Sequence, residues 1–299
     1  IICVPQVTDM VQMAVGDVVL KVVFFLQLGI GILGNALLLF IYRSSFFSGH
    51  RLRPTDLILT NIAVANTFVL LSKVINQIME DSRLSHTLEN IGCKVIYYFH
   101  RVSRDLSLCT TSLLSCFQAV TISPFSGIWA VLKSRISKNV RYSCFFCWIF
   151  NLAISTIFPL QIGVSLHNNS GFGTENYIFC QYITSQVGLS MVPLSFLGTG
   201  LMILMVSASI YMAWLLYKHS KRIQHLQHHS LTPRTSPEMR ATKTILLMVT
   251  NFIPFYFFNS IYIFYDTKSF SSYLWLQYIF KIFAGCFPSV SPLVLILQK

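Results

Sequence analysis

Charged residues are scarce in this chain of 299 residues. Asp, Glu, Lys and Arg together make up 11% of it, against about 25% in ordinary soluble domains. Hydrophobic residues make up 54%. A soluble protein with so few charges cannot cover its surface with polar groups. The composition therefore excludes an ordinary soluble domain and favours a membrane-spanning protein.

The motifs of common catalytic and metal sites are also lacking. The sequence holds no P-loop, no GxSxG and no HExxH. Cys144 and Cys147 form a CxxC pattern, but they lie in an apolar run without the strand and helix context of a redox motif. The histidines within residues 219–229 have no neighbouring carboxylate or cysteine to complete a zinc site. We therefore expect no enzyme activity, no cofactor and no metal.

Acidic residues are scarcer than basic ones. The 22 Lys and Arg against 10 Asp and Glu give a formal net charge of +12. The basic residues stand in short clusters between long apolar runs, which is typical of cytoplasmic loops that face anionic lipid and a cytosolic partner. We therefore expect contact with membrane lipid and none with nucleic acid. The N-terminus has no basic region before its first apolar run, so we expect no cleavable signal peptide.

Seven apolar segments are long enough to cross a bilayer, which takes about 20 residues as an α-helix. Within lipid each backbone amide must be paired inside its own segment, so we expect helices. The predicted fold is an all-α membrane protein: one seven-transmembrane-helix bundle over residues 18–297. An extracellular N-terminus (1–17) precedes it, and residues 298–299 begin a cytoplasmic tail. The predicted spans are 18–42, 56–79, 92–122, 142–163, 186–216, 242–265 and 273–297.

The distribution of Lys and Arg predicts the orientation, because cytoplasmic loops carry an excess of them. With the N-terminus outside and the C-terminus inside, the outer segments carry only Arg83 and Lys268. Asn168 begins an N-glycosylation triplet, which is usable only on the outer side. Cys93 tops the third span and Cys180 lies in the second outer loop, where two such thiols would oxidise to a disulfide.

The third predicted span is rich in polar residues. Tyr97, His100, Arg101 and Arg104 recur at intervals of three and four residues, so they share one helix face. Asp105 lies four residues after Arg101 and can pair with it. Charges at this depth cost about 2.5–3.5 kcal/mol on insertion scales and usually face the bundle interior. Two interpretations stay open: a ligand pocket, or an ion pair that only fixes helix packing.

Lys281 lies at a matching depth on the seventh predicted span, where we expect it to reach Asp105 or an anionic ligand. Our hypothesis is that Arg101, Arg104 and Lys281 form the floor of a polar cavity. Such a cavity suits a small, largely apolar molecule with an anionic group. The pocket candidates are Tyr97, His100, Arg101, Arg104, Asp105, Phe255, Phe258, Tyr262 and Lys281.

Seven spans, an outer N-terminus and an outer disulfide are typical of G-protein-coupled receptors. Shorter strings narrow this class, among them Arg53–Leu59, Gly92–Lys94, Leu106–Thr111, Gln118–Pro124 and Cys286–Pro292. They resemble the corresponding strings of vomeronasal type-1 receptors, and the resemblance runs from about residue 30 to residue 297. Like that family, the chain has Gln118-Ala119-Val120 where most rhodopsin-like receptors have an acidic-Arg-aromatic triplet.

The resemblance implies a chemosensory receptor of the plasma membrane. It would bind a small extracellular pheromone or odorant and activate a heterotrimeric G protein of the inhibitory type. It also implies glycosylation in the second outer loop, which fits Asn168. The chain departs from the family at Asp105, where Gly is usual, and at Lys281. The candidate G-protein contacts on the inner side are Lys133, Arg135, Lys138, Lys221, Arg222, Arg240 and Lys243.

Two alternatives remain beside this interpretation. A transporter or channel would line a substrate path with the buried basic residues, although many transporters show internal repeats and none is visible here. A bitter-taste receptor has a distantly similar layout. The strings in the third and seventh spans favour the vomeronasal resemblance over it.

Overall fold

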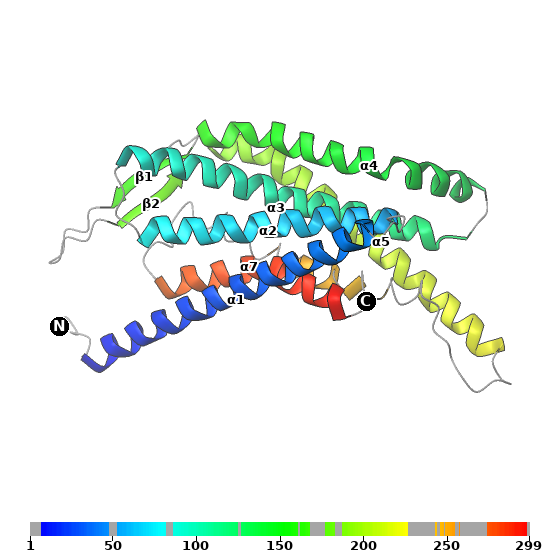
Figure 1. Cartoon of the computed structure of the whole chain (residues 1–299), viewed down its shortest axis with the longest axis horizontal. Coiled ribbons are helices and arrows are strands. Elements are labelled where there is room, and N and C mark those ends of the chain that lie inside the picture. The colour runs from blue at the N-terminus through cyan, green and yellow to red at the C-terminus, as the bar shows by residue number, and fades with distance from the viewer. Residues whose placement is uncertain are drawn as a thin grey trace.

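The computed structural model is a bundle of long helices with a small β-hairpin at one end (Figure 1). Its elements, in chain order, are α1 (Val7–Phe47), α2 (Pro54–Asp81), α3 (His86–Ile122), α4 (Ile128–Ile154), the 3-10 helix η1 (Ser155–Leu160), β1 (Ile162–His167), β2 (Tyr177–Tyr182), α5 (Val187–Leu226) and α7 (Leu274–Leu297). The residues that the structure describes are 7–47, 53–81, 86–124, 127–160, 162–167, 177–182, 187–226, 243, 246–247, 249–254, 257 and 274–297.

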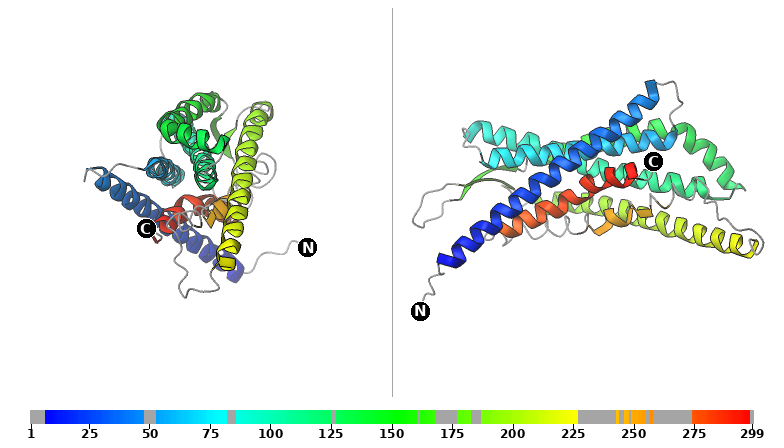
Figure 2. Two further views of the ribbon diagram at one scale, coloured as in Figure 1. Left: turned by 90° about the vertical axis from the view of Figure 1, so that its right-hand side faces the viewer. Right: turned by 60° about the horizontal axis from the view of Figure 1, so that its bottom comes forward.

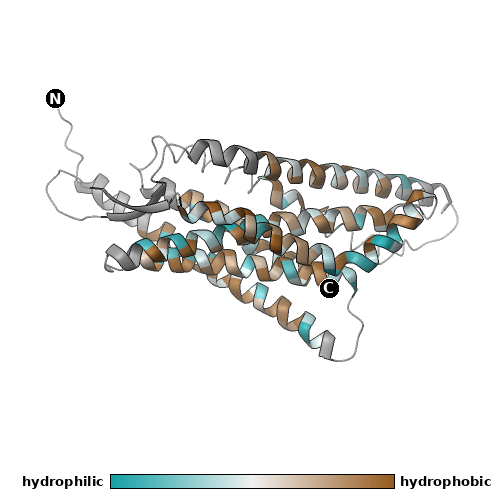
Figure 3. Cartoon of the chain, turned by 90° about the horizontal axis from the view of Figure 1, so that it is seen from above, coloured by the Kyte–Doolittle hydropathy of each residue, from teal (hydrophilic) through white to brown (hydrophobic). Residues whose placement is uncertain are grey.

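Six of the described helices are long and apolar enough to cross a membrane. The corresponding segments are Val18–Ser44, Pro54–Met79, Asn90–Ile122, Ile128–Ile157, Phe196–Lys218 and Ile279–Leu297. Large apolar side chains project from their outer faces, as with Leu33 (72% exposed) and Phe40 (71%). Brown, apolar residues dominate these helices in Figure 3. In water such exposure is unfavourable, so these faces are suited to lipid tails.

Local sequence signals set the ends of these helices. Pro54 stands in the first turn of α2, where its missing N–H costs nothing. The carboxylate of Asp56 reaches back and accepts a hydrogen bond from the Arg53 backbone N–H at 3.2 Å. Between α3 and α4 the chain turns through Pro124 and through Gly127, whose φ of 54° suits glycine. These residues fix where α2 and α4 begin.

α3 is the central helix of the bundle. It contacts α2, α4 and α5 as well as η1 and β1, and Figure 2 shows the helices grouped around it when the bundle is seen along its length. Buried residues make up 67% of its span, against 44% for the next most buried span, that of α2. A polar side chain on α3 is therefore held by neighbours from several helices.

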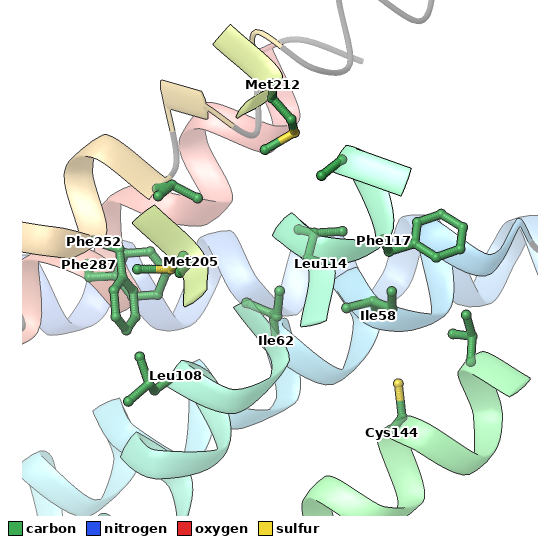
Figure 4. Close-up of a cluster of buried hydrophobic side chains, with 13 residues drawn as sticks. Ile58, Ile62, Leu108, Leu114, Phe117, Cys144, Met205, Met212, Phe252 and Phe287 are labelled. Carbon is green, nitrogen blue, oxygen red and sulfur yellow. The ribbon is translucent and has the colours of Figure 1, made fainter. Parts of the chain in front are cut away.

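The largest buried apolar cluster joins α2, α3, α4, α5, α7 and the described part of the sixth predicted span (Figure 4). Ile58, Leu108 and Met205 are at most 1% exposed. Phe252 and Phe287 meet edge to face with their ring centroids 4.3 Å apart. This cluster holds together the helices around the sites described below.

The fourth predicted span, 142–163, differs from the structure at both ends. The α4 helix begins at Ile128, so Lys133 and Arg135 lie on a helix and not in a loop. At the other end the α-helix stops at Ile154 and tightens into η1, which contains Pro159. Proline lacks the N–H that an α-helix needs and clashes with the preceding turn. The prediction that the helix reaches residue 163 was therefore wrong.

The β-hairpin was also missing from the expected all-α fold. β1 pairs antiparallel with β2, and Val164 stands opposite Cys180. Ile162, Val164 and Leu166 alternate with small or polar residues, which is the period of a strand. This alternation is a strand signal in the sequence, but it is only 6 residues long and is not a long apolar run.

Most of the described helices extend beyond their predicted spans, and α1 and α5 do so by the most residues at one end apart from α4. α1 begins at Val7, within the expected N-terminal segment 1–17, and α5 continues to Leu226, past the predicted end at 216. Hydropathy marks where a helix enters lipid, whereas the helix itself continues beyond it. Of the sixth predicted span, residues 243, 246–247, 249–254 and 257 are described, and all are helical.

A buried amide on α1 compensates for a proline on α7. Because Pro292 has no N–H, the carbonyl of Pro288 lacks its usual helical donor. The Asn35 side-chain amide donates to that carbonyl at 2.8 Å and is fully buried. Small residues allow the approach: a Cβ added to Gly34 would lie 3.0 Å from Pro292 Cγ. The α1–α7 contact therefore depends on Gly34, Asn35 and Pro292 together.

We predict that Asn35→Ala destabilises the protein by about 1 kcal/mol, because it leaves the Pro288 carbonyl buried without a donor. The expected result is a fall of about 2–4 °C in the thermal unfolding midpoint of the purified protein. Asn251→Ala is the matched control, because the Asn251 amide donates to Leu247 O within its own helix.

The same prediction has a second test in a double-mutant cycle. In a Pro292→Ala background, residue 292 again offers an N–H to the Pro288 carbonyl. Asn35→Ala should then lower the midpoint less than it does in the unaltered chain. An equal fall in the unfolding midpoint in both backgrounds would contradict the role given to Asn35.

Candidate functional site

A buried amide on α2 ties three helices together at mid-depth. The Asn66 side chain donates to Ser291 Oγ on α7 at 2.9 Å and accepts from Ser107 Oγ on α3 at 2.8 Å. Asn66 is 1% exposed. Both ends of the amide are thus satisfied without water, which a membrane interior requires. This junction lies beneath the charged residues of α3.

Two arginines share one carboxylate on α3. Arg101 Nε lies 2.9 Å from Asp105 Oδ2. Arg104 donates from Nε and Nη2 to Asp105 Oδ1 at 3.1 and 3.0 Å. Arginine stays protonated in proteins, so this trio keeps a net positive charge. The predicted pairing of Arg101 with Asp105 is present, and Arg104 joins it.

Two lysines from α2 and α7 lie beside this trio. Lys73 Nζ donates to the Lys281 backbone carbonyl at 3.1 Å, and Lys281 Nζ donates to Gln77 Oε1 at 3.1 Å. Lys73 is also close enough to Arg104 to interact with its charge. We call Lys73, Arg101, Arg104, Asp105 and Lys281 the basic cluster. It places four basic side chains against one carboxylate.

His100 borders the basic cluster. Its Nδ1 lies 2.9 Å from Ser72 Oγ. The Ser72 hydroxyl proton is already donated to the Val69 carbonyl at 2.8 Å. His100 Nδ1 is therefore the donor in this pair, which leaves its other ring nitrogen, Nε2, as an acceptor.

The structure brings together most of the pocket candidates that it describes. His100, Arg101, Arg104, Asp105 and Lys281 lie in or beside the basic cluster, and Tyr97 lies half-buried one turn outward on α3. Lys281 was expected to reach Asp105 or an anionic ligand. In the structure both carboxylate oxygens of Asp105 face arginines, and Lys281 Nζ donates to Gln77 Oε1. The contact with an anionic ligand stays a prediction. The remaining candidates, Phe255, Phe258 and Tyr262, lie outside the described residues.

Residues on α2 were missed as members of this site. Ser72, Lys73 and Gln77 all contribute contacts to it. Lys73 and Gln77 stand four residues apart in an apolar segment, so they share a helix face. That spacing was the available signal, because a polar pair at this depth faces the protein interior.

The N-terminal end of α3 lies beside the hairpin. Cys93 is disulfide-bonded and 2% exposed, and β1 packs against α3. Cys180 lies on β2, but its side chain is not among the described ones, so the Cys93–Cys180 pairing stays a prediction. The glycosylation candidate Asn168 also lies outside the described residues.

At the end of the bundle opposite the hairpin, which the sequence predicts to be the inner end, side chains from α4 and α5 converge on the end of α3. Lys133 Nζ donates to the Ser123 carbonyl at 2.6 Å. The Ser123 hydroxyl donates to Ala119 O, so the Tyr211 hydroxyl, 3.0 Å away, donates to Ser123 Oγ. The Tyr211 ring also stacks on Trp129, with centroids 5.9 Å apart. We call Ser123, Trp129, Lys133 and Tyr211 the inner junction.

The other candidate G-protein contacts are mostly exposed where they are described. Arg135 and Lys138 are exposed on α4, as are Lys221 on α5 and Lys243 in the sixth segment. Lys221 lies over the Tyr217 ring at 5.0 Å. The side chain of Arg222 and the whole of Arg240 lie outside the described part.

Comparison with known proteins identifies relatives of this chain. Residues 18–299 match the profile of the Vomeronasal organ pheromone receptor family. The chain is 36% identical over 292 residues to Vomeronasal type-1 receptor 1 of Homo sapiens, covering 97% of this chain and 83% of the relative. It is 36% identical over 250 residues to Vomeronasal type-1 receptor 45 of Mus musculus, covering 81% and 77%.

These matches extend over nearly the whole bundle, including the basic cluster and the inner junction. The relatives are receptors and not enzymes, and the matches do not favour a transporter, a channel or a bitter-taste receptor. The chain therefore belongs to the vomeronasal organ pheromone receptor family and is a multi-pass, G-protein-coupled chemosensory receptor of the plasma membrane.

Proposed function

We propose that the receptor crosses the membrane seven times, with its N-terminus outside and its C-terminus inside. Six described helices are long and apolar enough to span. The segment 242–265 is as apolar, and its described residues 249–254 are helical. The excess of Lys and Arg on the side of the inner junction supports this orientation. The hairpin with Cys180 and the basic cluster then belong to the outer half.

We predict that Asn168 carries an N-linked glycan, because this orientation places its loop outside. Endoglycosidase treatment should raise the electrophoretic mobility of the receptor, and Asn168→Gln should abolish that shift. An acceptor created in the third inner loop by Gln227→Asn with His229→Ser should stay unmodified. Modification of the new acceptor, with none at Asn168, would show the opposite orientation.

The proposed ligand is a small, largely apolar molecule that carries an anionic group. The observation behind this is the basic cluster, which holds four basic side chains against one carboxylate within the bundle. Basic side chains that gather in a low-dielectric interior attract an anionic group strongly, and an anion that approaches them lowers the cost of their burial. The anionic group would displace Gln77 from Lys281 or join Arg104, while apolar walls hold the remainder.

We expect Arg104→Ala and Lys281→Ala each to lower ligand potency at least about tenfold, which corresponds to the loss of about 1.4 kcal/mol of binding energy. The measurement is ligand-stimulated nucleotide exchange on inhibitory-type G protein in membranes that carry the receptor. The ligand panel pairs apolar alcohols with their sulfate or carboxylate counterparts. The anionic member of each pair should be the more potent.

Lys94→Ala is the matched control for this experiment, because Lys94 lies on α3 near the outer boundary and away from the basic cluster. The ligand potency measured with Lys94→Ala should stay close to that measured with the unaltered receptor. Surface expression is matched for all variants. Unchanged potency in both Arg104→Ala and Lys281→Ala would overturn the assignment of this site.

The inner junction is the proposed element that restrains G-protein coupling. Lys133 and Tyr211 hold the inner ends of α3, α4 and α5 together through Ser123. A cytosolic partner that inserts among these ends has to separate them, so their bonds favour the uncoupled arrangement. Arg135, Lys138, Lys221 and Lys243 are exposed around this end and provide positive charge for the partner.

We predict that Tyr211→Phe raises ligand-independent nucleotide exchange by about 2- to 10-fold, which is the population shift that one net hydrogen bond allows. The substitution keeps the ring stacked on Trp129 and removes the bond to Ser123. Lys138→Met is the control, because it removes an exposed charge and leaves the contacts of the inner junction in place. Basal nucleotide exchange in this variant should equal that of the unaltered receptor or fall below it. Basal exchange that does not rise in Tyr211→Phe at normal surface expression would contradict the restraint.

A further inference from the structure

Two thiols face each other between α3 and α4, apart from the basic cluster and the inner junction. Cys109 on α3 and Cys147 on α4 are both free cysteines, and their sulfurs lie 2.8 Å apart. Cys147 is 6% exposed and packs with Ala65 and Leu106, while Cys109 is half-buried beside it. A disulfide needs its sulfurs about 2.05 Å apart. The two sulfurs therefore have to approach by only about 0.75 Å to reach bonding distance.

We propose that Cys109 and Cys147 form an oxidative modification site, at which an uncharged peroxide joins α3 to α4 through a disulfide. In the first step one sulfur attacks a peroxide oxygen and becomes a sulfenic acid. Hydrogen peroxide releases water at this step, and an alkyl peroxide releases its alcohol. In the second step the other thiol attacks the sulfenic sulfur, the S–S bond forms and water leaves. The two thiols are oxidised and one peroxide is reduced.

The membrane interior determines how fast this site reacts and how long the product lasts. The thiolate is the reactive form, and apolar surroundings disfavour it, so the first step is slow. The second step is fast once a sulfenic acid exists, because the partner sulfur is already in contact. Glutathione is charged and does not enter hydrocarbon at appreciable concentration. A disulfide formed at this depth is therefore protected from the cytosolic reductant.

The packing makes Cys109 the partner of Cys147, although Cys144 is closer to Cys147 in the sequence. Cys144 lies three residues before Cys147 on the same helix, and it packs into the large apolar cluster with Ile58. The sulfur contact of Cys147 is with Cys109 across the helix interface. The CxxC pattern in the sequence is thus not the reactive pair.

The test is to treat the full-length receptor in lipid nanodiscs with hydrogen peroxide or tert-butyl hydroperoxide over hours. Remaining thiols are then blocked, and cross-linked peptides are identified by mass spectrometry. We expect a Cys109–Cys147 link in the unaltered receptor and in the control Cys144→Ser, and its loss in Cys109→Ser and in Cys147→Ser. The yield of the disulfide is measured as the loss of two thiols per receptor that react with the blocking reagent under denaturing conditions.

Two outcomes would overturn the proposal. One is a link from Cys147 to Cys144 in place of Cys109. The other is full retention of both thiols in the folded receptor under conditions that oxidise the same thiols in detergent-denatured chain. Both readouts are independent of ligand and G protein, so they do not depend on the proposed binding site.

Discussion

The absence of water inside the membrane is the constraint on which this structure depends. Each polar group that lies at mid-depth has to find its partner within the protein. Asn35 meets the carbonyl that Pro292 leaves without a donor, and Asn66 joins Ser107 to Ser291. These bonds fix the mutual positions of α1, α2, α3 and α7 more specifically than apolar contact does, since lipid tails are as apolar as the helix faces.

The same constraint makes the basic cluster a candidate ligand site. Asn66 is satisfied at both ends by neutral groups, whereas Arg101 and Arg104 share a single carboxylate and two lysines lie beside them. A structural ion pair has one base for each acid, whereas the described residues of the basic cluster include four bases and one acid. We propose that a negative group arriving from outside balances these bases. This is why the ligand-site interpretation is favoured over the packing interpretation, which the sequence left open.

Much of the helical part of the fold was predictable, and the reasons for the failures are physical. Long apolar runs report contact with lipid, and six of them fall on long helices in the structure. Hydropathy does not report where a helix ends, so the start of α4 at Ile128 and the end of α5 at Leu226 were missed. The hairpin was overlooked because its alternation is short. The shared face of Arg101 and Arg104, and the pairing of Arg101 with Asp105, followed from helical spacing. The place of Lys281 depends on how α7 packs against α2, which one sequence does not reveal.

A link between the outer basic cluster and the inner side has to use elements that reach both. α3 carries Arg104 and ends at Ile122, next to Ser123. Arg104 and Ile122 are 18 residues apart and therefore about 27 Å apart along the helix, but α3 is the most buried of the described spans and is held from several sides. α7 is different. It carries Lys281 in the basic cluster and Ser291 in the bond to Asn66, and Pro288 and Pro292 lie between or beside these contacts. A side chain of α1 replaces a backbone donor there, so bending α7 at this point breaks fewer of its own backbone hydrogen bonds than bending α3 would. The proline segment of α7 is thus the place where a change at Lys281 reaches the middle of the bundle at the lowest cost.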